Sequence, residues 1–509
     1  MPKMKKYISI AVFTLCISCL NAGAQQNFRS GYFLDGYTYA FKLNPAFKGE
    51  RGFFSMPVLG NLTMGVETNL GISTFLYPLE GSNKLTTFMS PTVSDDVFMK
   101  ALRKNNNFNT NLNLSMMAFG FKTGKAYHTV DLSFKTDVGV NMPKDLFRFM
   151  KVGAADNNPV YDLSNLGARA DMRMEIAYGY SRDITDWLRV GARLKLLVGL
   201  ARADMKIASM DVEMSGNKWA ITGNGSLTTC LPVGMGFMTM GEAGTATDPS
   251  QNNRLDLTAF KTPSDLSGYM KMLKSPSYGG ALDIGISADF LKYFTASFSL
   301  LDIGMMQWRN MTVANTPDLA WTFPGFTIAS GENGEAPSMD DQLKQLGDEL
   351  LSAMYFEASD YEAKKTKWLA MTAHLGIEAR CPGYERLTLG LLGTQRIDGA
   401  YSWTEGRFSL NWALLRWIGL TANYAISNFG HSFGGALNIH FPGITLYAGL
   451  DSFKPLLNVT PDFLPIDAMN TNVAIGLNFS FGKYDGKYPR KAKAKKEKKK
   501  KDKEEEFLL

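Results

Sequence analysis

Apolar side chains alternate with small, polar or charged ones along much of this chain, and this alternation restricts its fold more than any other feature. The clearest case runs from Asn472 to Gly482, where the apolar residues are Val473, Ile475, Leu477, Phe479 and Phe481. Successive side chains of a β-strand point to opposite faces. The stretch therefore predicts a strand with one apolar face and one small or polar face.

Other stretches place charges on the polar face. Leu188, Val190 and Ala192 alternate with Arg189, Gly191 and Arg193. A lipid-facing arginine costs about 2–4 kcal/mol near the membrane midplane, so these charges are predicted to point inward. No segment after residue 24 approaches the ~20 apolar residues that a membrane helix needs. Any membrane span of this chain is therefore predicted to be a β-strand.

A soluble β-sandwich also shows alternation, because one face of each sheet packs on a core. The number and spacing of the strands favour a barrel instead. We predict strands at 62–76, 110–122, 127–140, 169–182, 187–205, 278–290, 293–304, 367–379, 386–396, 401–411, 417–427, 432–441, 443–451 and 471–482. This makes fourteen strands. A further hairpin between 203 and 230 would either make sixteen or simply extend above the membrane.

The connections also differ systematically between the two ends of the predicted strands. Very long segments follow five of the odd-numbered strands, at 77–109, 141–168, 206–277, 305–366 and 452–470. Bacterial outer-membrane barrels combine an even strand number with short periplasmic turns and long extracellular loops. The sequence thus predicts an all-β fold, a membrane-spanning antiparallel β-barrel over 61–482 in the outer membrane of a Gram-negative cell. Its long loops would be extracellular and both termini periplasmic.

The first 24 residues carry an export signal. A cluster of lysines at 3, 5 and 6 precedes an apolar run and a small-residue site at Ala22-Gly23-Ala24. These features are typical of a secretory signal peptide. A lipid-attachment site at Cys19 is the less favoured alternative, because Cys16 stands where an aliphatic residue is expected.

The formal charge of +6 comes from the two ends of the chain. Residues 1–24 hold three lysines, and the tail at 483–509 holds twelve basic and six acidic residues, which leaves the body at −3. We therefore expect no nucleic-acid partner. The tail is predicted to be a disordered, lysine-rich periplasmic extension, with a periplasmic partner or anionic peptidoglycan as candidates for binding it.

Residues 25–60 precede the first predicted strand and are rich in aromatic side chains without a clean period. Such a segment is poorly suited to free solution, so we predict a plug or hatch in the barrel lumen or across its periplasmic mouth. Amphipathic helices are predicted in the loops after Ser94, Pro143 and Ser264 and around 338–354.

Inward-facing charges of both signs are dense on the predicted strands. The predicted lumen network comprises Glu67, Asp131, Lys135, Asp137, Arg173, Glu175, Arg189, Arg193, Lys195, Asp283, Asp289, His374 and Glu378. Unpaired interior charge is costly, so mixed signs favour ion pairs that hold a plug in place. A constriction that selects charged solutes is the functional alternative.

Motifs for catalysis or cofactor binding are not evident in the sequence. Gly234, Gly236 and Gly241 lack the spacing of a phosphate-binding loop, and the four histidines lack metal-ligand spacing. His374 and Glu378 form the one constellation that resembles part of a hydrolase site, and a polar lumen network explains them better. Cys230 and Cys381, the two cysteines beyond the signal, do not define a disulfide framework. We expect no metal, no cofactor and no enzymatic activity.

Two resemblances to known families add to this interpretation. Asn44-Pro45-Ala46, ahead of fourteen predicted strands, resembles the long-chain fatty acid transporter (FadL-like) superfamily, which includes the PorV-type barrels of type IX secretion. The segments Phe108–Leu114, Met142–Phe147 and Ala177–Arg182 resemble a closer domain-of-unknown-function family of outer-membrane barrels. That likeness covers most of residues 28–482. The FadL-like resemblance implies an N-terminal hatch and a hydrophobic ligand, although the ligand-binding residues of that superfamily have no one-to-one match here.

The sequence leaves two functions open. The favoured one is passive uptake of hydrophobic or amphipathic small molecules by a barrel in contact with outer-membrane lipid. The alternative is a non-transporting, secretion-associated barrel of the PorV kind that holds partners through its loops and basic tail.

Overall fold

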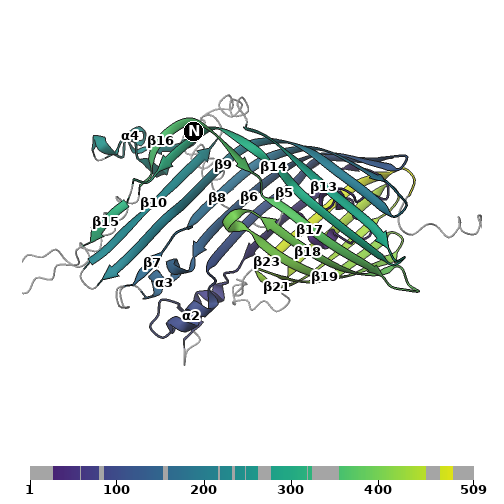
Figure 1. The fold of residues 1–509 in the computed structure, drawn as a ribbon, viewed down its shortest axis with the longest axis horizontal. Helices are drawn as coiled ribbons and strands as arrows, with labels where there is room; N and C mark the ends of the chain where they lie inside the picture. Colours follow the sequence, from purple (N-terminus) through teal and green to yellow (C-terminus); the bar gives the residue numbers. More distant parts are fainter. Residues whose placement is uncertain are drawn as a thin grey trace, which may run out of the picture.

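The protein folds as an antiparallel β-barrel in a computed structural model (Figure 1). The structure describes residues 27–57, 59–79, 85–152, 159–215, 218–231, 235–246, 248–261, 277–317, 319–323, 355–453 and 470–484. The predicted signal peptide, the tail beyond residue 484 and the predicted helices after Ser264 and around 338–354 lie outside this range.

Fourteen strands form the closed wall of the barrel. In order around the ring they are β2 (Asn61–Thr68), β5 (Asn105–Thr123), β6 (Ala126–Pro143), β8 (Gly167–Asp183), β9 (Leu188–Ser215), β13 (Ser277–Phe290), β14 (Phe294–Asn315), β17 (Met371–Arg380), β18 (Leu387–Ile397), β19 (Trp403–Leu415), β20 (Ile418–Ser427), β21 (Gly430–His440), β22 (Ile444–Phe453) and β23 (Asn470–Phe481). Each strand pairs with the next, and β23 closes the ring on β2 with Ile475 opposite Leu62. The predicted count of fourteen is confirmed.

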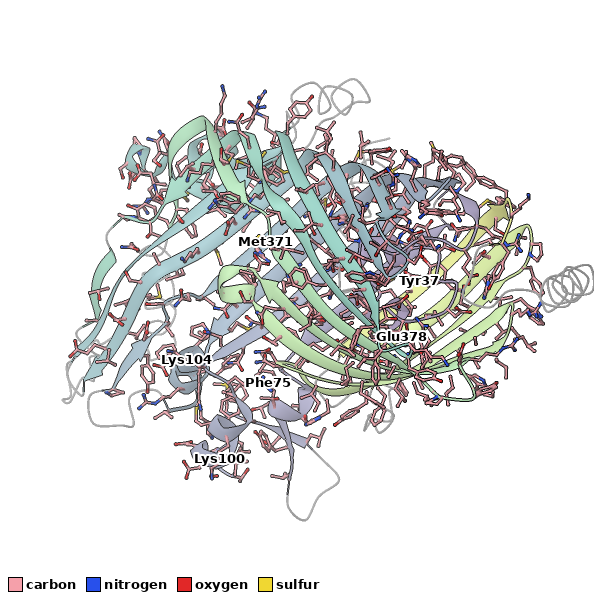
Figure 2. All side chains as sticks on the ribbon, turned by 45° about the vertical axis from the view of Figure 1, so that its right-hand side comes forward. Tyr37, Phe75, Lys100, Lys104, Met371 and Glu378 are labelled. Atoms are coloured by element: carbon pink, nitrogen blue, oxygen red, sulfur yellow. The ribbon has the colours of Figure 1, made fainter. Side chains whose placement is uncertain are left out.

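The two ends of the barrel differ, and Figure 1 shows the difference. At the short-turn end, brief turns such as 124–125 and 441–443 join successive strands. At the long-loop end lie α2 (Asp95–Ala101), α3 (Lys144–Val152), α4 (Met240–Ala243), β3 (Leu76–Pro78), β4 (Leu85–Thr87), β7 (Val160–Asp162), β10 (Lys218–Cys230), β11 (Gly236–Thr239), β12 (Leu255–Lys261), β15 (Leu319–Phe323) and β16 (Glu357–Trp368). In Figure 2, Lys100 lies at the long-loop end, whereas Tyr37 and Glu378 lie in the half with the short turns.

Two of the predicted loop helices are present. The side chain of Ser94 accepts a hydrogen bond from the Val97 amide and so caps the start of α2. The second helix, α3, follows Pro143 directly, as the sequence predicts. Phe98 and Phe147 of these two helices pack in one buried cluster, which folds the loops against each other at the long-loop end.

The region between 203 and 230 extends the wall and adds no strand to the ring. β9 continues to Ser215, and β10 pairs antiparallel with the C-terminal part of β9, from Arg202 to Ser215. On its other side β10 pairs with Met311–Asn315 of β14. This part of β14 lies past Gln307, the last residue of β14 that pairs with β13. The sixteen-strand alternative is therefore wrong, and the sheet instead extends past the ring at the long-loop end.

The first predicted strand is shorter than the expected range of 62–76. β2 ends at Thr68, whose hydroxyl accepts a hydrogen bond from the Leu70 amide and so turns the chain out of the sheet. A 3-10 helix (Ile72–Thr74) follows. At the other side, β1 (Gly52–Ser55) pairs with β23 and β5 in the wall. The wall thus begins at residue 52, earlier than the predicted boundary at residue 60.

The two faces of the wall have opposite character. Large apolar side chains such as Leu194, Leu375 and Ile475 are exposed on the outside, whereas Arg193, His374 and Asn472 are buried on the inside. A closed sheet with this distribution satisfies all its backbone hydrogen bonds and presents an apolar surface to lipid. Among the described residues, no helix is long and apolar enough to cross a membrane.

Candidate functional site

Residues 27–51, here called the lumen segment, lie inside the barrel and form the candidate functional site. Most of its side chains are buried, from Phe28 to Ala46. It includes two short 3-10 turns, Arg29–Gly31 and Ala40–Lys42, and no strand. Because the segment has no regular ladder of its own, its polar groups must find partners on the surrounding wall.

Arg29 is the first anchor of the lumen segment. Its Nη2 lies 3.1 Å from Glu67 Oε1 on β2 and 2.9 Å from Glu405 Oε2 on β19. The guanidinium carbon of Arg29 also lies over the ring of Trp403, 4.4 Å from the ring centroid. All three ionisable groups are almost fully buried, so this cation joins carboxyl groups on two separate strands.

Asp451 on β22 holds the backbone at the same place. Its carboxylate accepts hydrogen bonds from the Arg29 amide at 2.8 Å and from the Ser30 amide. Arg407 completes the group, because its Nη1 donates to Ser30 Oγ at 3.1 Å and to the Asp451 carbonyl at 2.8 Å. The start of the lumen segment is thereby tied to three wall strands.

Lys42 is the second anchor. Its Nζ lies 3.2 Å from Asp131 Oδ2 and donates to the hydroxyls of Ser115 and Ser133 at 2.9 and 2.8 Å. Burial lowers the pKa of Lys42 to about 8, while the neighbouring Asp131 acts in the opposite direction. The three oxygen partners come from β5 and β6 and surround the ammonium group.

Replacing Lys42 by methionine should lower the free energy of unfolding by about 1.5–3 kcal/mol, because three hydrogen bonds to a charged group are lost. Asp131 keeps its 2.6 Å contact with Arg193, which limits the effect. Urea unfolding in phospholipid vesicles measures the change. The matched control is Lys48→Met, whose pair with Asp183 is 4.0 Å long and partly exposed. The control should stay within about 0.5 kcal/mol, and equal effects of the two variants would contradict the anchor.

The motif Asn44-Pro45-Ala46 forms the third anchor. Asn44 Nδ2 donates to the carbonyls of Ile286 and Phe298, each at 3.2 Å, and Asn44 Oδ1 accepts from the Ala46 amide at 2.9 Å. The turn rests on Gly191 of β9 and Gly285 of β13, which face each other across the two strands. A Cβ at Gly191 would lie 2.1 Å from the Pro45 carbonyl oxygen. Only glycine leaves room for the turn at this position.

Glycines on other wall strands provide space for further parts of the lumen segment. A Cβ at Gly390 would meet Phe33 at 2.4 Å, and one at Gly449 would meet Phe28 at 2.4 Å. A Cβ at Gly419 would lie 2.8 Å from the backbone oxygen of Asp35. The inner surface of the wall is thus shaped to fit this segment.

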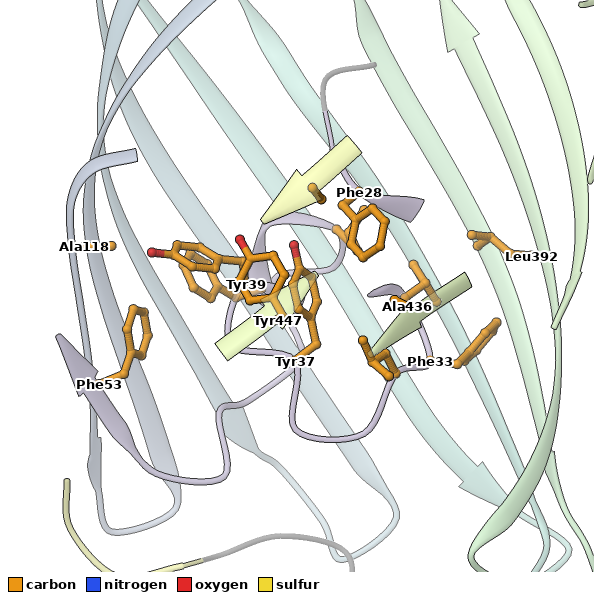
Figure 3. Close-up of a cluster of buried hydrophobic side chains, with 14 residues drawn as sticks. Phe28, Phe33, Tyr37, Tyr39, Phe53, Ala118, Leu392, Ala436 and Tyr447 are labelled. Atoms are coloured by element: carbon orange, nitrogen blue, oxygen red, sulfur yellow. The ribbon is translucent and has the colours of Figure 1, made fainter. Parts of the chain in front are cut away.

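An aromatic cluster fills the lumen between the anchors (Figure 3). Tyr37 packs edge-on against Tyr447 of β22 with ring centroids 5.0 Å apart. The hydroxyl of Tyr39 donates to Ser55 at 3.0 Å and Asn478 at 2.9 Å. Burial raises the pKa of both Tyr37 and Tyr39. Packed aromatic rings with satisfied hydroxyls leave little space for water at this level of the barrel.

A cavity of about 500 Å³ lies between the lumen segment and the short-turn end. Aromatic residues Tyr32, Phe33 and Phe47 line it from the segment, and Trp187 lines it from the β8–β9 turn. Charged groups also line it, including Glu378 on the wall. Its size falls within the range of pockets that hold small organic molecules.

The sequence profile of a family of unknown function (DUF5723) matches residues 45–451. The chain belongs to this family. No relative among curated proteins matches its sequence. The DUF5723 match begins within the third anchor and covers every wall strand from β1 to β21.

Several solved outer-membrane barrels are similar in structure to the chain at low identity. The toluene transporter TbuX of Ralstonia pickettii has a TM-score of 0.40 and 8% identity, covering 87% of this chain and 94% of that one. A FadL homologue of Pseudomonas aeruginosa has a TM-score of 0.34 and 11% identity, covering 90% and 98%. The translocator domain of the autotransporter NalP from Neisseria meningitidis has a TM-score of 0.32 and 6% identity, covering 85% and 90%. The assignment of a ligand must therefore rest on the geometry of this DUF5723 barrel itself.

The structure brings most of the predicted lumen charges together into two groups. Glu67 and Asp131 contact the lumen segment directly through Arg29 and Lys42. The others pair along the wall beyond the segment, in the contacts Lys135–Glu175 (2.8 Å), Arg173–Asp137 (2.8 Å), Arg193–Asp283 (2.9 Å) and Lys195–Asp283 (2.7 Å). These chains of mixed charge line the wall on the long-loop side of the aromatic cluster.

The remaining predicted charges lie nearer the short-turn end. Arg189 pairs with Asp183 at 2.6 Å. Asp289 lines the cavity, but its side chain is 52% exposed where it pairs with Arg380, so it lies at the solvated mouth rather than inside the network. His374 Nδ1 shares a hydrogen bond with the Thr394 hydroxyl at 3.0 Å, and Glu378 accepts from Thr388 at 2.9 Å. The two residues of the hydrolase-like constellation thus take different partners.

Several important residues are absent from the predicted network. Glu405 and Arg407 occupy inward positions of a predicted strand, so the same alternation identifies them as lumen residues. Arg29 and Lys42 lie in the aperiodic segment, where no pattern marks them. Among the described residues, no group of three or more His, Cys, Asp or Glu side chains could hold a metal ion, and Cys230 and Cys381 are free.

Proposed function

We propose that this protein is an outer-membrane uptake barrel for hydrophobic or amphipathic small molecules, closed at rest by its lumen segment. The short-turn end would face the periplasm and the long loops the outside, as in bacterial barrels generally. The observation that supports this proposal best is the pairing of a blocked lumen with an aromatic cavity directly beneath the block.

The way the lumen segment is held in the barrel favours a movable segment over a permanently filled core. The lumen segment belongs to no sheet, and side-chain contacts with the wall hold it at a few anchors. The cavity would lie on the periplasmic side of the segment, so a solute taken up from outside would reach Tyr32 and Phe33 in the cavity only after it passes the segment. Displacement of the segment would connect the cavity with the rest of the lumen.

Deleting residues 27–51, with the export signal and β1 retained, tests this function. A fourteen-stranded wall without its filling encloses an aqueous path, so single-channel conductance in planar bilayers should rise at least about tenfold. Uptake of toluene or of a short-chain alcohol into proteoliposomes should rise as well. Unchanged conductance in a correctly folded deletion variant would favour the alternative, a non-transporting interaction barrel.

A further inference from the structure

The cavity at the short-turn end carries a charge pattern that narrows the class of molecule it would bind. Its charged lining residues are six acids, Asp35, Glu50, Asp183, Asp186, Asp289 and Glu378, and four bases, Lys48, Lys125, Arg189 and Arg380. Acidic groups therefore outnumber basic groups around a space of about 500 Å³. Two of these acids, Glu50 and Asp35, also contact His440, at 2.9 and 4.0 Å.

The basic groups are largely committed to carboxylates. Arg189 Nη1 lies 2.6 Å from Asp183 Oδ1, and Lys48 Nζ lies 4.0 Å from the other oxygen of that carboxylate. Arg380 Nη2 lies 3.0 Å from Asp289 Oδ1. A bound anion would have to compete with these pairs while facing an excess of negative charge.

The inner wall of the cavity adds aromatic surfaces and one buried carboxylate. Tyr32 packs edge-on against Phe33 at 4.8 Å and against Phe47 at 5.1 Å, so the three rings form a continuous aromatic surface. Glu378, which is 4% exposed, lies in the lining of the same cavity. Aromatic faces beside a carboxylate are the arrangement that recognises organic cations.

We propose that this cavity is a binding site for a small organic cation, an amine or quaternary ammonium that bears an aromatic or short alkyl group. The ammonium would lie near Glu378, and the apolar part would pack against Tyr32, Phe33 and Phe47. This inference deepens the proposed uptake function, on which its physiological meaning rests, by naming the substrate class.

The test measures equilibrium binding to the full mature protein in detergent by isothermal titration calorimetry. The probes are benzyltrimethylammonium, the neutral benzyl alcohol and the anion benzoate, which share one aromatic ring. The cation should bind about tenfold more tightly than either of the others, and its affinity should fall as salt rises. Equal affinities, preference for benzoate or no binding of the cation would overturn the proposal.

Two variants locate the cation in the cavity. Glu378→Gln preserves the shape and the contact with Thr388 and should weaken cation binding about tenfold. Phe47→Leu keeps the site apolar but removes a ring, and should weaken it several-fold. Glu213→Gln, the same change at an exposed position on β9 outside the cavity, should have no effect.

The outcomes separate this proposal from the uptake function. If Glu378→Gln does not fold, Phe47→Leu alone decides, and wild-type affinity in that variant would overturn the site. Absence of cation binding together with increased conductance of the deletion variant would remove the cation site and leave the uptake function in place. Cation binding without a change in conductance of the deletion variant would support the site and contradict closure of the barrel by the lumen segment.

Discussion

Replacing Arg29 by methionine will lower the free energy of unfolding by about 3–5 kcal/mol, because it leaves buried carboxylates without their cation. Glu67 and Glu405 are both nearly inaccessible to solvent and converge on this one guanidinium. Glu405 keeps Arg407 at 2.9 Å, but Arg29 is the cation that joins the two acids. Asp451 still accepts from the backbone amides of residues 29 and 30, so we expect the start of the lumen segment to loosen rather than to detach, with a parallel rise in bilayer conductance.

Denaturant unfolding in vesicles and single-channel recording on the same preparation test both parts of this prediction. Arg182→Met is the matched control, since Arg182 is exposed at the end of β8. It should change stability by no more than about 0.5 kcal/mol. A stability loss in Arg29→Met without any rise in conductance would mean that the segment stays in place when its first anchor is removed.

Replacing Gly191 by leucine will displace the turn at Asn44-Pro45-Ala46 and open the barrel without breaking the wall. The added Cβ would lie 2.1 Å from the Pro45 oxygen, which is a backbone atom and cannot move aside by changing rotamer. The turn must therefore lift, and Asn44 loses its hydrogen bonds to Ile286 and Phe298. Loss of two buried hydrogen bonds and the associated packing should cost about 2–4 kcal/mol.

Gly406→Leu is the control for this substitution. A Cβ at Gly406 meets nothing within 4 Å, and the residue is exposed on β19. A leucine there should leave both stability and conductance close to those of the wild type. Accessibility of Cys substituted at Ala46 to a membrane-impermeant maleimide adds a direct readout. With Cys230 and Cys381 replaced by serine, labelling should be slow when the wall is otherwise unchanged, since Ala46 is fully buried, and fast when Gly191→Leu is added.

The wall of the barrel could be predicted from the sequence because lipid imposes the period of two directly. Each predicted wall strand has a counterpart in the barrel, and the first of them ends at Thr68 rather than at residue 76. The ends at the long-loop side could not be predicted equally well. β9 continues to Ser215 and β14 to Asn315, where strands still pair but lipid no longer requires apolar residues on the outer face. The alternation weakens there although the sheet continues.

The candidate site could be predicted only in part. Alternation identifies inward charges such as Asp131 and Arg193, because a charge on a wall strand has one tolerable direction. It does not identify their partners, which depend on how fourteen strands bring distant residues together. Arg29 and Lys42 lie in a segment without periodicity, and their role follows from carboxylates far along the chain. The sequence pattern identifies Gly191 and Gly285 as small inward-facing residues. Their role, to leave room for the turn at Asn44-Pro45-Ala46, follows only from the structure.

The hydrogen bond between the Arg29 amide and Asp451 joins residues that are 422 positions apart. Arg29 precedes every wall strand in the sequence, and its acceptor lies on β22, the next-to-last wall strand. The intervening chain must be ordered before this contact can form, so the hydrogen bond can form only once β22 is in place in the wall. If the lumen segment closes the barrel as proposed, partly assembled intermediates would therefore remain open until β22 takes its place in the wall.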